Sequence, residues 1–307
     1  MNLSPEFNAP NKSVYMSSKM PPSSVLSLTS EIDSFKAACV QMTPIHLDKR
    51  ANIDKMAIFI KESAKQGAKL IVFPELIITG YVGPISPKEY QDFYQASEPI
   101  PGPTTNLLCE IAEKNNVYVV FGMVERGESK LGPVMYNVAV LLGPNGLIGN
   151  HRKSHLPVVE KNYWLPGNEI EVFDTQLGRI SLFVCYEFWF PEVIRVAGLK
   201  GAQIIIDIAN WPVFDTDPWF AMGPGIAAAN MAWFIGVNRV GGEDYWPGMG
   251  GSMIVNPSGK VVTKGTDKEC IFYGDVDIPE IMKRRSFPPV WFDRRPELYE
   301  SILKKYF

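Results

Sequence analysis

An α/β fold is predicted for this chain by the regular alternation of short apolar strands with amphipathic helices. Several of the strands are apolar along their whole length, which is typical of sheets that are buried on both faces. In addition, 46% of the 307 residues are hydrophobic, enough to fill a substantial core without disulfide bonds. We therefore expect one large α/β domain in which helices cover the sheets from outside.

The first half of this domain alternates strands with two helices and ends in a hairpin. The first helix carries Ile53, Met56 and Ile60 at helical spacing, and Asn115-Asn116 ends the second. The turn Pro144-Asn145-Gly146 joins the last two strands. The expected elements are strand 35–42, helix 52–66, strand 69–73, helix 104–115, strand 117–124 and hairpin strands 136–143 and 147–151.

The second half repeats the alternation. Pro191 suits the first position of a helix, and the turn Pro257-Ser258-Gly259 predicts a second hairpin. The expected elements are strand 180–184, helix 191–199, strand 203–207, helix 218–231, strand 233–238, hairpin strands 252–256 and 260–263, strand 270–276 and helix 277–285.

Both ends of the chain differ from the domain at 35–285. Residues 1–34 are rich in Ser, Pro and Asn without periodicity or the pattern of a signal peptide, so we expect a flexible extension or an expression artefact. Residues 286–307 form a C-terminal extension, and 286–292 are apolar and proline-rich. Such a stretch would be a liability on a monomer, so a homodimer or a higher even-numbered homo-oligomer is predicted.

Composition excludes several classes of protein. With 30 Lys and Arg against 33 Asp and Glu, the net charge of −3 argues against a nucleic-acid partner. No apolar run reaches the roughly 18 residues of a membrane span. The 4 cysteines are scattered and favour a reducing cytoplasm over a disulfide framework. The 3 histidines show no zinc-binding spacing, so neither a metal nor an organic cofactor is expected.

One cysteine stands at a position suited to nucleophilic chemistry. The apolar strand 180–184 ends on Cys185, and aromatic residues precede the helix that begins at Pro191. A sharp strand-to-helix turn exposes a side chain and leaves backbone N–H groups beside it. A thiol there can attack a carbonyl carbon while those donors stabilise the oxyanion. The alternative is a small buried hydrophobic residue, the commoner role of a lone cysteine.

Two further segments favour catalysis. Glu75 lies at the end of the strand predicted at 69–73, and Lys153 follows the hairpin predicted at 136–151. Taken singly, each residue would be interpreted as a charged group on the surface. In order and spacing, Pro74-Glu75, the RKSHLP segment with Lys153 and the CYEFWFPE segment with Cys185 resemble the nitrilase superfamily of carbon–nitrogen hydrolases. Weaker matches extend the resemblance over 35–283, at Gly80-Tyr81, Tyr136-Asn137, Pro166-Gly167, Asn210-Trp211-Pro212, Asn238-Arg239-Val240-Gly241 and Asn256-Pro257-Ser258-Gly259.

The resemblance implies a sandwich of two β-sheets flanked by helical layers (α-β-β-α) and a Glu-Lys-Cys triad that works through a covalent thioester. Cys185 would be the nucleophile and Glu75 the base that activates the thiol and later water. Lys153 and the backbone N–H of Tyr186 would stabilise the oxyanion. Glu160, which matches a second family glutamate, would hold Lys153 or steer the leaving group, unless it is only a surface acid.

The sequence indicates the residues that bind the substrate less clearly than it indicates the catalytic residues. The aromatic residues Tyr81, Tyr136, Tyr186, Trp189 and Trp211 lie in or beside the motif segments and could line an apolar pocket, or belong to the core or a dimer interface. No arginine directly follows the nucleophile, which disfavours an N-carbamoyl amino acid.

Hydrolysis of a small neutral amide is therefore favoured over the alternatives. The Tyr186-Glu187 pair matches the Trp-Glu of true nitrilases at one position of two, which leaves a nitrile as the second choice. An N-carbamoyl amide hydrolase stays a further alternative. A non-catalytic nitrilase-like binding protein is the alternative of another class, against which the intact triad argues.

Overall fold

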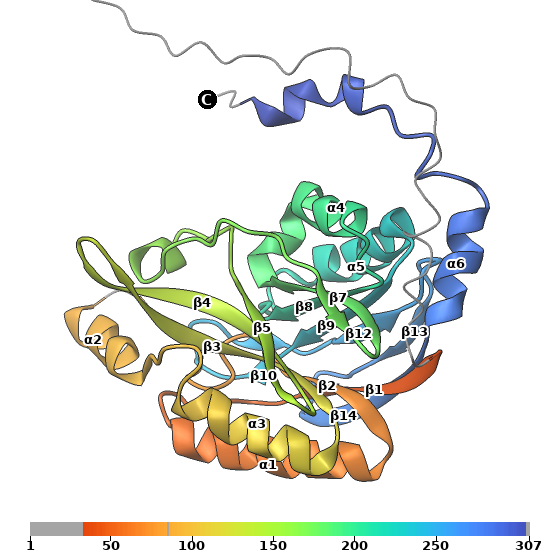
Figure 1. The fold of residues 1–307 in the computed structure, drawn as a ribbon. Helices are drawn as coiled ribbons and strands as arrows, with labels where there is room; N and C mark the ends of the chain where they lie inside the picture. Colours follow the sequence, from red (N-terminus) through yellow and green to blue (C-terminus); the bar gives the residue numbers. More distant parts are fainter. Residues whose placement is uncertain (1–32, 85, 305–307) are drawn as a thin grey trace, which may run out of the picture.

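The computed structural model describes residues 33–84 and 86–304, which form two stacked six-stranded β-sheets between layers of helices (Figure 1). The first sheet has the order β14-β1-β2-β3-β4-β5, with β1 (Ser34–Gln41), β2 (Ala68–Val72), β3 (Tyr118–Ser129), β4 (Gly132–Gly143), β5 (Gly146–Arg152) and β14 (Cys270–Asp277). The second has the order β13-β12-β9-β8-β7-β6, with β6 (Phe173–Thr175), β7 (Gly178–Val184), β8 (Ile204–Ala209), β9 (Trp233–Asn238), β12 (Met253–Val255) and β13 (Val261–Lys264). The predicted α-β-β-α sandwich is thereby confirmed.

The two sheets share one plan. Three neighbouring strands run parallel in each, β1, β2 and β3 in the first and β7, β8 and β9 in the second, and antiparallel strands flank them. A separate antiparallel ribbon consists of β10 (Val240–Gly241) and β11 (Gly248–Met249). Side chains that follow parallel strands gather at one edge of a sheet, which is where ligands bind in open α/β sheets.

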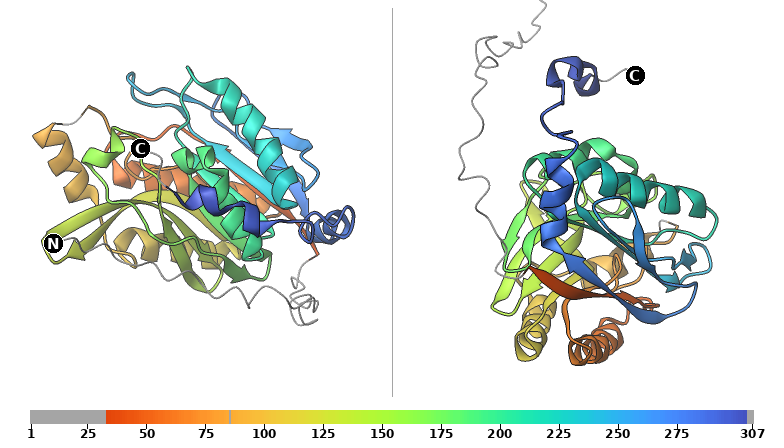
Figure 2. Two further views of the ribbon diagram at one scale, coloured as in Figure 1. Left: turned by 90° about the horizontal axis from the view of Figure 1, so that it is seen from above. Right: turned by 90° about the vertical axis from the view of Figure 1, so that its right-hand side faces the viewer.

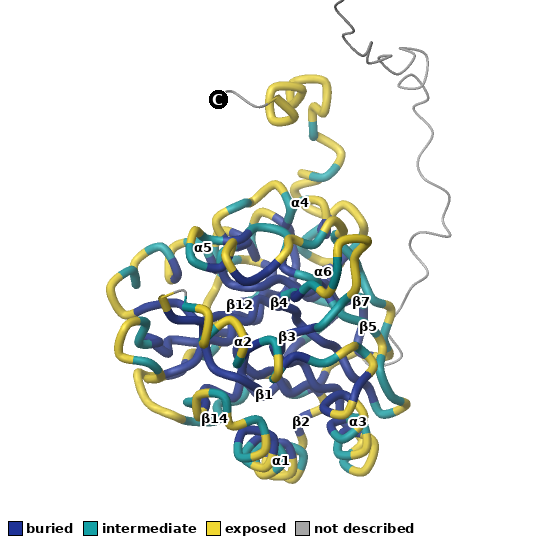
Figure 3. Tube along the Cα trace, turned by 90° about the vertical axis from the view of Figure 1, so that its left-hand side faces the viewer, coloured by how far each residue is buried: buried dark blue, intermediate teal, exposed yellow. Residues whose placement is uncertain are grey.

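Helices cover the outer face of each sheet. The long helices α1 (Lys49–Lys65) and α3 (Pro103–Asn115) lie on the first sheet, and α4 (Pro191–Leu199) and α5 (Thr216–Asn230) lie on the second (Figure 2). On β1, Ala38 and Val40 pack with the helical layer, whereas Ala37 and Cys39 pack in the core between the sheets. Burial of both faces explains why the central strands are apolar throughout (Figure 3).

Two helices show how local signals set the boundaries. Asp48 caps α1 by accepting the Ala51 N–H at 3.0 Å, so this helix begins before the predicted residue 52. The helix α2 (Pro87–Ala96) was not predicted, although Ser86 caps it by accepting the Glu89 N–H at 3.0 Å and a proline begins it. The cap followed by proline was the available sequence signal.

The described residues begin just before β1 and end in a C-terminal segment with short 3-10 helices. Of the predicted N-terminal extension 1–34, residues 1–32 lie outside the described residues, and Ser34 already pairs with Asp277 in the first sheet. Helix α6 (Ile278–Ser286) leads to the C-terminal segment, which contains the short 3-10 helices η5 (Pro296–Leu298) and η6 (Glu300–Leu303). Within this segment Phe287 is 81% exposed, whereas the Trp291 ring lies 5.0 Å from the guanidinium carbon of Arg195 on α4.

The described residues contain neither a disulfide bond nor a helix suited to cross a membrane. All four cysteines are free. None of the helices in residues 33–84 and 86–304 combines the length and apolar character that crossing a membrane requires.

Candidate active site

The predicted catalytic residues follow the carboxyl ends of strands from both sheets. Glu75 lies three residues beyond β2, Lys153 directly follows β5, and Cys185 directly follows β7. The two sheets meet at this edge, because the backbone N–H of Asn210, just after β8, donates to Glu75 Oε2 at 2.8 Å. Sequence segments that are far apart are therefore brought together by the packing of one sheet on the other.

Lys153 lies between two glutamates in the interior. Its Nζ donates to Glu75 Oε1 at 2.7 Å and to Glu160 Oε1 at 2.6 Å. All three side chains are 0% exposed. Glu160 begins the short 3-10 helix η3 (Glu160–Asn162). Because its side chain is buried, Glu160 is not the surface acid that was the alternative interpretation. A buried charge cluster is expensive to desolvate, which makes an arrangement kept only for stability improbable.

Polar side chains hold both carboxylates in place. Asn137 Nδ2 donates to Glu75 Oε1 at 2.7 Å and to Glu160 Oε2 at 3.2 Å. The Tyr81 hydroxyl donates to Glu160 Oε1 at 2.9 Å. These bonds fix the two acids on opposite sides of Lys153. Asn137 was not singled out from the sequence, although the Tyr136-Asn137 pair was among the matching motifs.

The electrostatics of the cluster favour a charged lysine. Burial alone would lower the pKa of Lys153, but the negative charges of Glu160 and Glu75 outweigh it and raise the pKa above its ordinary value. Burial raises the pKa of Glu160, an effect that the Lys153 charge opposes. The ammonium is therefore a permanent positive charge at this edge of the sandwich.

Cys185 has the backbone of a strained turn. It begins the short 3-10 helix η4 (Cys185–Trp189) and has a φ of 53°, in the left-handed region that residues with a side chain rarely occupy. Burial raises the pKa of its thiol well above the usual range, and Glu75 adds to this effect while Lys153 opposes it. The resting thiol therefore keeps its proton and needs a base to become a nucleophile.

A second buried carboxylate joins the Lys153 segment to the Cys185 turn. Glu187 accepts from His151 Nε2 at 2.9 Å, from the Ser154 N–H at 3.0 Å and from the Val184 N–H at 2.8 Å. Burial would raise the pKa of Glu187, but the charge and hydrogen bond of His151 lower it overall. In the sequence, Glu187 is only part of the cysteine motif, and this link was not predicted.

The aromatic residues predicted to bind substrate divide into several groups. Tyr81 is buried and belongs to the glutamate cluster through its hydroxyl. Trp189 is 41% exposed and stacks on the buried Trp211 with ring centroids 5.6 Å apart, and Tyr186 lies in the same 3-10 helix as Trp189.

Tyr136 lies apart from the other residues predicted for the site. Neighbouring residues on a strand point to opposite faces, and Asn137 points into the glutamate cluster. Tyr136 therefore lies on the outer face of the first sheet, where the Arg152 guanidinium carbon is 4.0 Å from its ring centroid. Its side chain is not brought to the catalytic cluster.

The loop between β10 and β11 contacts the site through Tyr81. Glu243 Oε1 accepts the Tyr81 N–H at 3.1 Å and contacts His46 Nδ1 at 3.1 Å, and its other oxygen binds Arg239. The Trp246 ring lies 5.6 Å from that of Tyr81. These residues were missed in the sequence because they act through contacts with a segment some 160 residues earlier in the chain.

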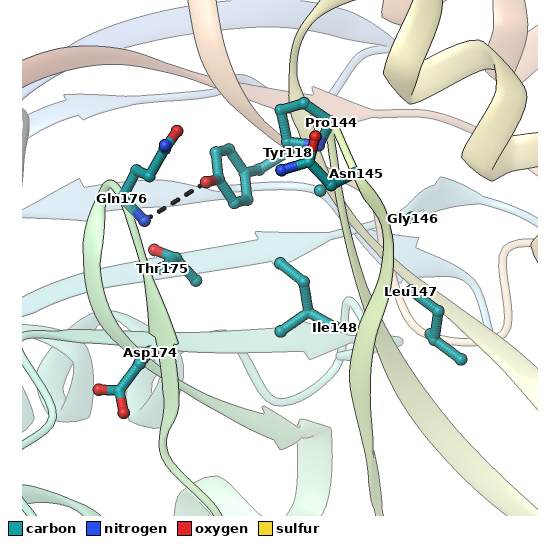
Figure 4. Close-up of a pocket in the computed structure, with 10 residues that line it drawn as sticks. Tyr118, Pro144, Asn145, Gly146, Leu147, Ile148, Asp174, Thr175 and Gln176 are labelled. Carbon is teal, nitrogen blue, oxygen red and sulfur yellow. Dashed lines mark hydrogen bonds between the residues drawn. The ribbon is translucent and has the colours of Figure 1, made fainter.

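A surface pocket lies at the opposite end of the sandwich. It has a volume of about 480 Å³ and is formed by the β4–β5 turn at Pro144 and Asn145 and by the β6–β7 turn at Thr175 and Gln176 (Figure 4). The Gln176 N–H donates to the Tyr118 hydroxyl at 3.3 Å within it. Because these turns precede β5 and β7, the pocket is separated from the catalytic edge by the length of the strands.

Comparison with known proteins identifies the family of this chain. The carbon–nitrogen hydrolase family model matches residues 36–285. A protein named nitrilase from Pyrococcus abyssi is 34% identical over 86% of this chain and 98% of its own length. The omega-amidase of Bos taurus is 29% identical over 89% of this chain and 99% of its own length.

A solved structure shows the same fold. The crystal structure of a carbon–nitrogen hydrolase from Helicobacter pylori superposes with a TM-score of 0.80 at 25% identity, covering 90% of this chain and 100% of the other. The family match spans both sheets and the edge that carries Glu75, Lys153 and Cys185. This chain therefore belongs to the carbon–nitrogen hydrolases of the nitrilase superfamily, enzymes that act on carbon–nitrogen bonds other than peptide bonds.

Proposed function

We propose that this enzyme hydrolyses a small neutral carboxamide to a carboxylate and ammonia through a thioester on Cys185. The buried Glu75–Lys153–Glu160 cluster beside this thiol is the observation that carries the proposal. Similarity to an omega-amidase supports amide hydrolysis as the reaction class. The role of each residue is inferred from the chemistry of its side chain and from its contacts.

In the acylation step, Glu75 accepts the thiol proton as the sulfur attacks the amide carbon. The carbonyl π electrons move to oxygen and form an oxyanion. Glu75 then gives the proton to the amide nitrogen, the carbon–nitrogen bond breaks, and ammonia leaves as the carbonyl of the thioester forms again. Because the thiol is protonated at rest, a base beside it is required for this step.

Lys153 suits the role of oxyanion donor. An ammonium has three N–H donors, and among the described residues two of them are used, by Glu75 and Glu160. The third is left for the substrate oxygen. The backbone N–H of Tyr186, at the start of η4, is the second donor that we assign to it.

The deacylation step reuses the same groups. Glu75 takes a proton from a water molecule, whose oxygen attacks the thioester carbon. The carbon–sulfur bond breaks, the sulfur recovers the proton from Glu75, and the carboxylic acid leaves and ionises. The enzyme therefore returns to its starting protonation state, and no redox partner is required.

The charges of the site favour a neutral acyl group. Two glutamates face one lysine, so an anionic substrate would meet no surplus of positive charge. The nearby Arg239 is bound by Glu243 and by the backbone carbonyl of Trp246. Trp189, which ends the 3-10 helix that Cys185 begins, is partly exposed and offers an apolar surface that suits a small aliphatic or aromatic group.

A nitrile is the second candidate substrate. Similarity to a Pyrococcus protein named nitrilase favours it, at a higher identity than that of the omega-amidase. The same thiol could attack the nitrile carbon. An N-carbamoyl amide stays a weaker alternative, since it calls for recognition of a carboxylate.

A substrate panel with matched cysteine variants tests the proposal. Small aliphatic and aromatic amides and nitriles would be assayed for ammonia and carboxylate together. Cys185→Ala should abolish turnover with an unchanged melting temperature, whereas Cys109→Ala, at a half-buried thiol on α3, should keep it. Intact-mass analysis should show one acyl adduct on Cys185. More than a few per cent of activity in Cys185→Ala would remove the nucleophile from the proposal.

A further inference from the structure

A buried carboxyl group that has no part in the proposed reaction lies beside the nucleophile. Asp207 is the only charged residue of β8, whose other members are isoleucine and alanine, and it is 0% exposed. The strand lies between β7 and β9, where Asp207 pairs with Phe183 and Gly236. Burying a carboxyl in such a strand costs stability, so the residue needs a compensating role.

Among the described residues, Asp207 makes one hydrogen bond, to the backbone of the proposed nucleophile. Its Oδ1 accepts the backbone N–H of Cys185 at 2.7 Å. The N–H groups of a first helical turn have no intrahelical acceptor, and this one belongs to the residue with the left-handed φ of 53°. The preceding N–H, of Val184, is held by Glu187. Two carboxyl groups therefore hold two successive N–H groups at the turn.

We propose that Asp207 is a positioning residue that holds the Cys185 backbone in its left-handed conformation. A residue with a side chain is strained in the left-handed region and persists there only where its surroundings impose it. This conformation sets the direction of the thiol and of the next N–H, that of Tyr186. The inference rests on the proposed function, in which both groups meet the substrate carbonyl.

Burial favours the neutral form of Asp207 over the carboxylate. Oδ2 is buried and has no hydrogen-bond partner among the described residues. Burial raises the pKa of Asp207 well above its ordinary value. The hydrogen bond from the Cys185 N–H and the charge of Lys153 lower this pKa, whereas the charges of Glu187 and Glu75 raise it further. A neutral acceptor suits this position, because a second negative charge would oppose formation of the thiolate.

Two substitutions separate the acceptor from the charge. Asp207→Asn keeps an acceptor oxygen in a neutral group of the same shape, so kcat should stay within about threefold of the wild type. Asp207→Leu fills the space without an acceptor, and kcat should fall by roughly 10–100-fold with KM nearly unchanged, as expected for a misplaced nucleophile. Ile205→Val, two residues earlier on the same strand, is the packing control and should keep kcat.

The alkylation of Cys185 by iodoacetamide provides a readout that needs no substrate. The rate for Asp207→Asn should match that of the wild type, and the rate for Asp207→Leu should fall at least about tenfold. If the leucine variant does not fold, Asp207→Ala takes its place with the same expectations. If the wild type hydrolyses no amide or nitrile, the proposed function fails, and the alkylation rates alone decide the role of Asp207.

Three results would overturn the inference. One is a leucine or alanine variant that keeps kcat and the alkylation rate within twofold. Another is an asparagine variant as impaired as the leucine variant, which would show that an acceptor is insufficient. The third is an Ile205→Val variant that loses as much kcat as Asp207→Leu, together with a similar fall in melting temperature. That result would indicate that packing alone explains the effect.

Discussion

Replacing Lys153 by methionine should destabilise the fold as well as stop the reaction. Methionine keeps most of the stem but removes the ammonium that lies 2.7 Å from Glu75 and 2.6 Å from Glu160. Removing one partner of a buried ion pair costs about 3–5 kcal/mol, because the other charge is left unpaired. At about 2–4 °C per kcal/mol for a domain of this size, Tm should fall by roughly 6–20 °C at pH 7.

The size of this fall should depend on pH. Without the lysine, the folded cluster binds a proton at a pH where the unfolded chain has released it, since burial already raises the pKa of Glu160 in the intact cluster. A folded state that binds more protons than the unfolded state loses stability as pH rises. The difference in Tm between wild type and Lys153→Met should therefore widen from pH 5 to pH 8, as measured by scanning calorimetry.

Two control variants test whether the fall in Tm comes from the unpaired carboxylates. Lys161→Met changes an exposed lysine beside Glu160 and should leave Tm unchanged. Adding Glu160→Gln to Lys153→Met removes one unpaired carboxylate and should restore part of Tm without restoring turnover. A Tm difference below 2 °C at pH 8, or one that does not vary with pH, would show that the cluster contributes no buried charge pairing.

Two further substitutions and one measurement of assembly size test separate parts of the molecule. Glu75→Gln keeps the shape but removes the base, so kcat should fall by at least about 10², measured by ammonia release; a change below threefold would reassign the base. Glu187→Gln should lower Tm by roughly 5–10 °C at pH 7. Because the pKa of Glu187 is lowered from 4.5, this stabilisation is complete above pH 4.5 and lost below it, so calorimetry should show the difference narrowing at pH 3–4; a constant difference would contradict this. Light scattering at micromolar concentration should show a homodimer or a higher even-numbered assembly, with a partner covering 286–292; a monomer alone would refute that.

Most of the fold could be predicted because the central strands are short apolar runs that alternate with helices. The strand β3 shows where this fails, since it continues to Ser129 and not to the predicted residue 124. Its last residues include Glu125 and Arg126, which have no apolar signal, and they are extended because they pair with Tyr136 and Met135 of β4. Pairing between strands is a non-local interaction that local propensity does not encode.

The residues that gather at the candidate site were easier to predict than the orientation of their side chains. The motif segments indicated Glu75, Lys153, Glu160 and Cys185, and the described structure places their side chains at one edge of the sandwich. On β4, however, both faces are buried, so the sequence pattern could not say which of two neighbours faces the site. The phase of that strand is set by its register with β5, where Val138 pairs with Arg152.

The balance of charge explains why one lysine and two glutamates suit the proposed reaction. When the thiol proton passes to Glu75, that carboxylate becomes neutral at the moment when the substrate oxygen becomes negative. The hydrogen bond from Lys153 to Glu75 then weakens while a new one to the oxyanion strengthens, so the ammonium gains a partner in the transition state that it lacked before. Glu160 stays bound to Lys153 throughout and keeps the ammonium charged and in place. The net charge of the site is the same before and after proton transfer, so the low-dielectric interior opposes the step far less than it would oppose creation of a new charge.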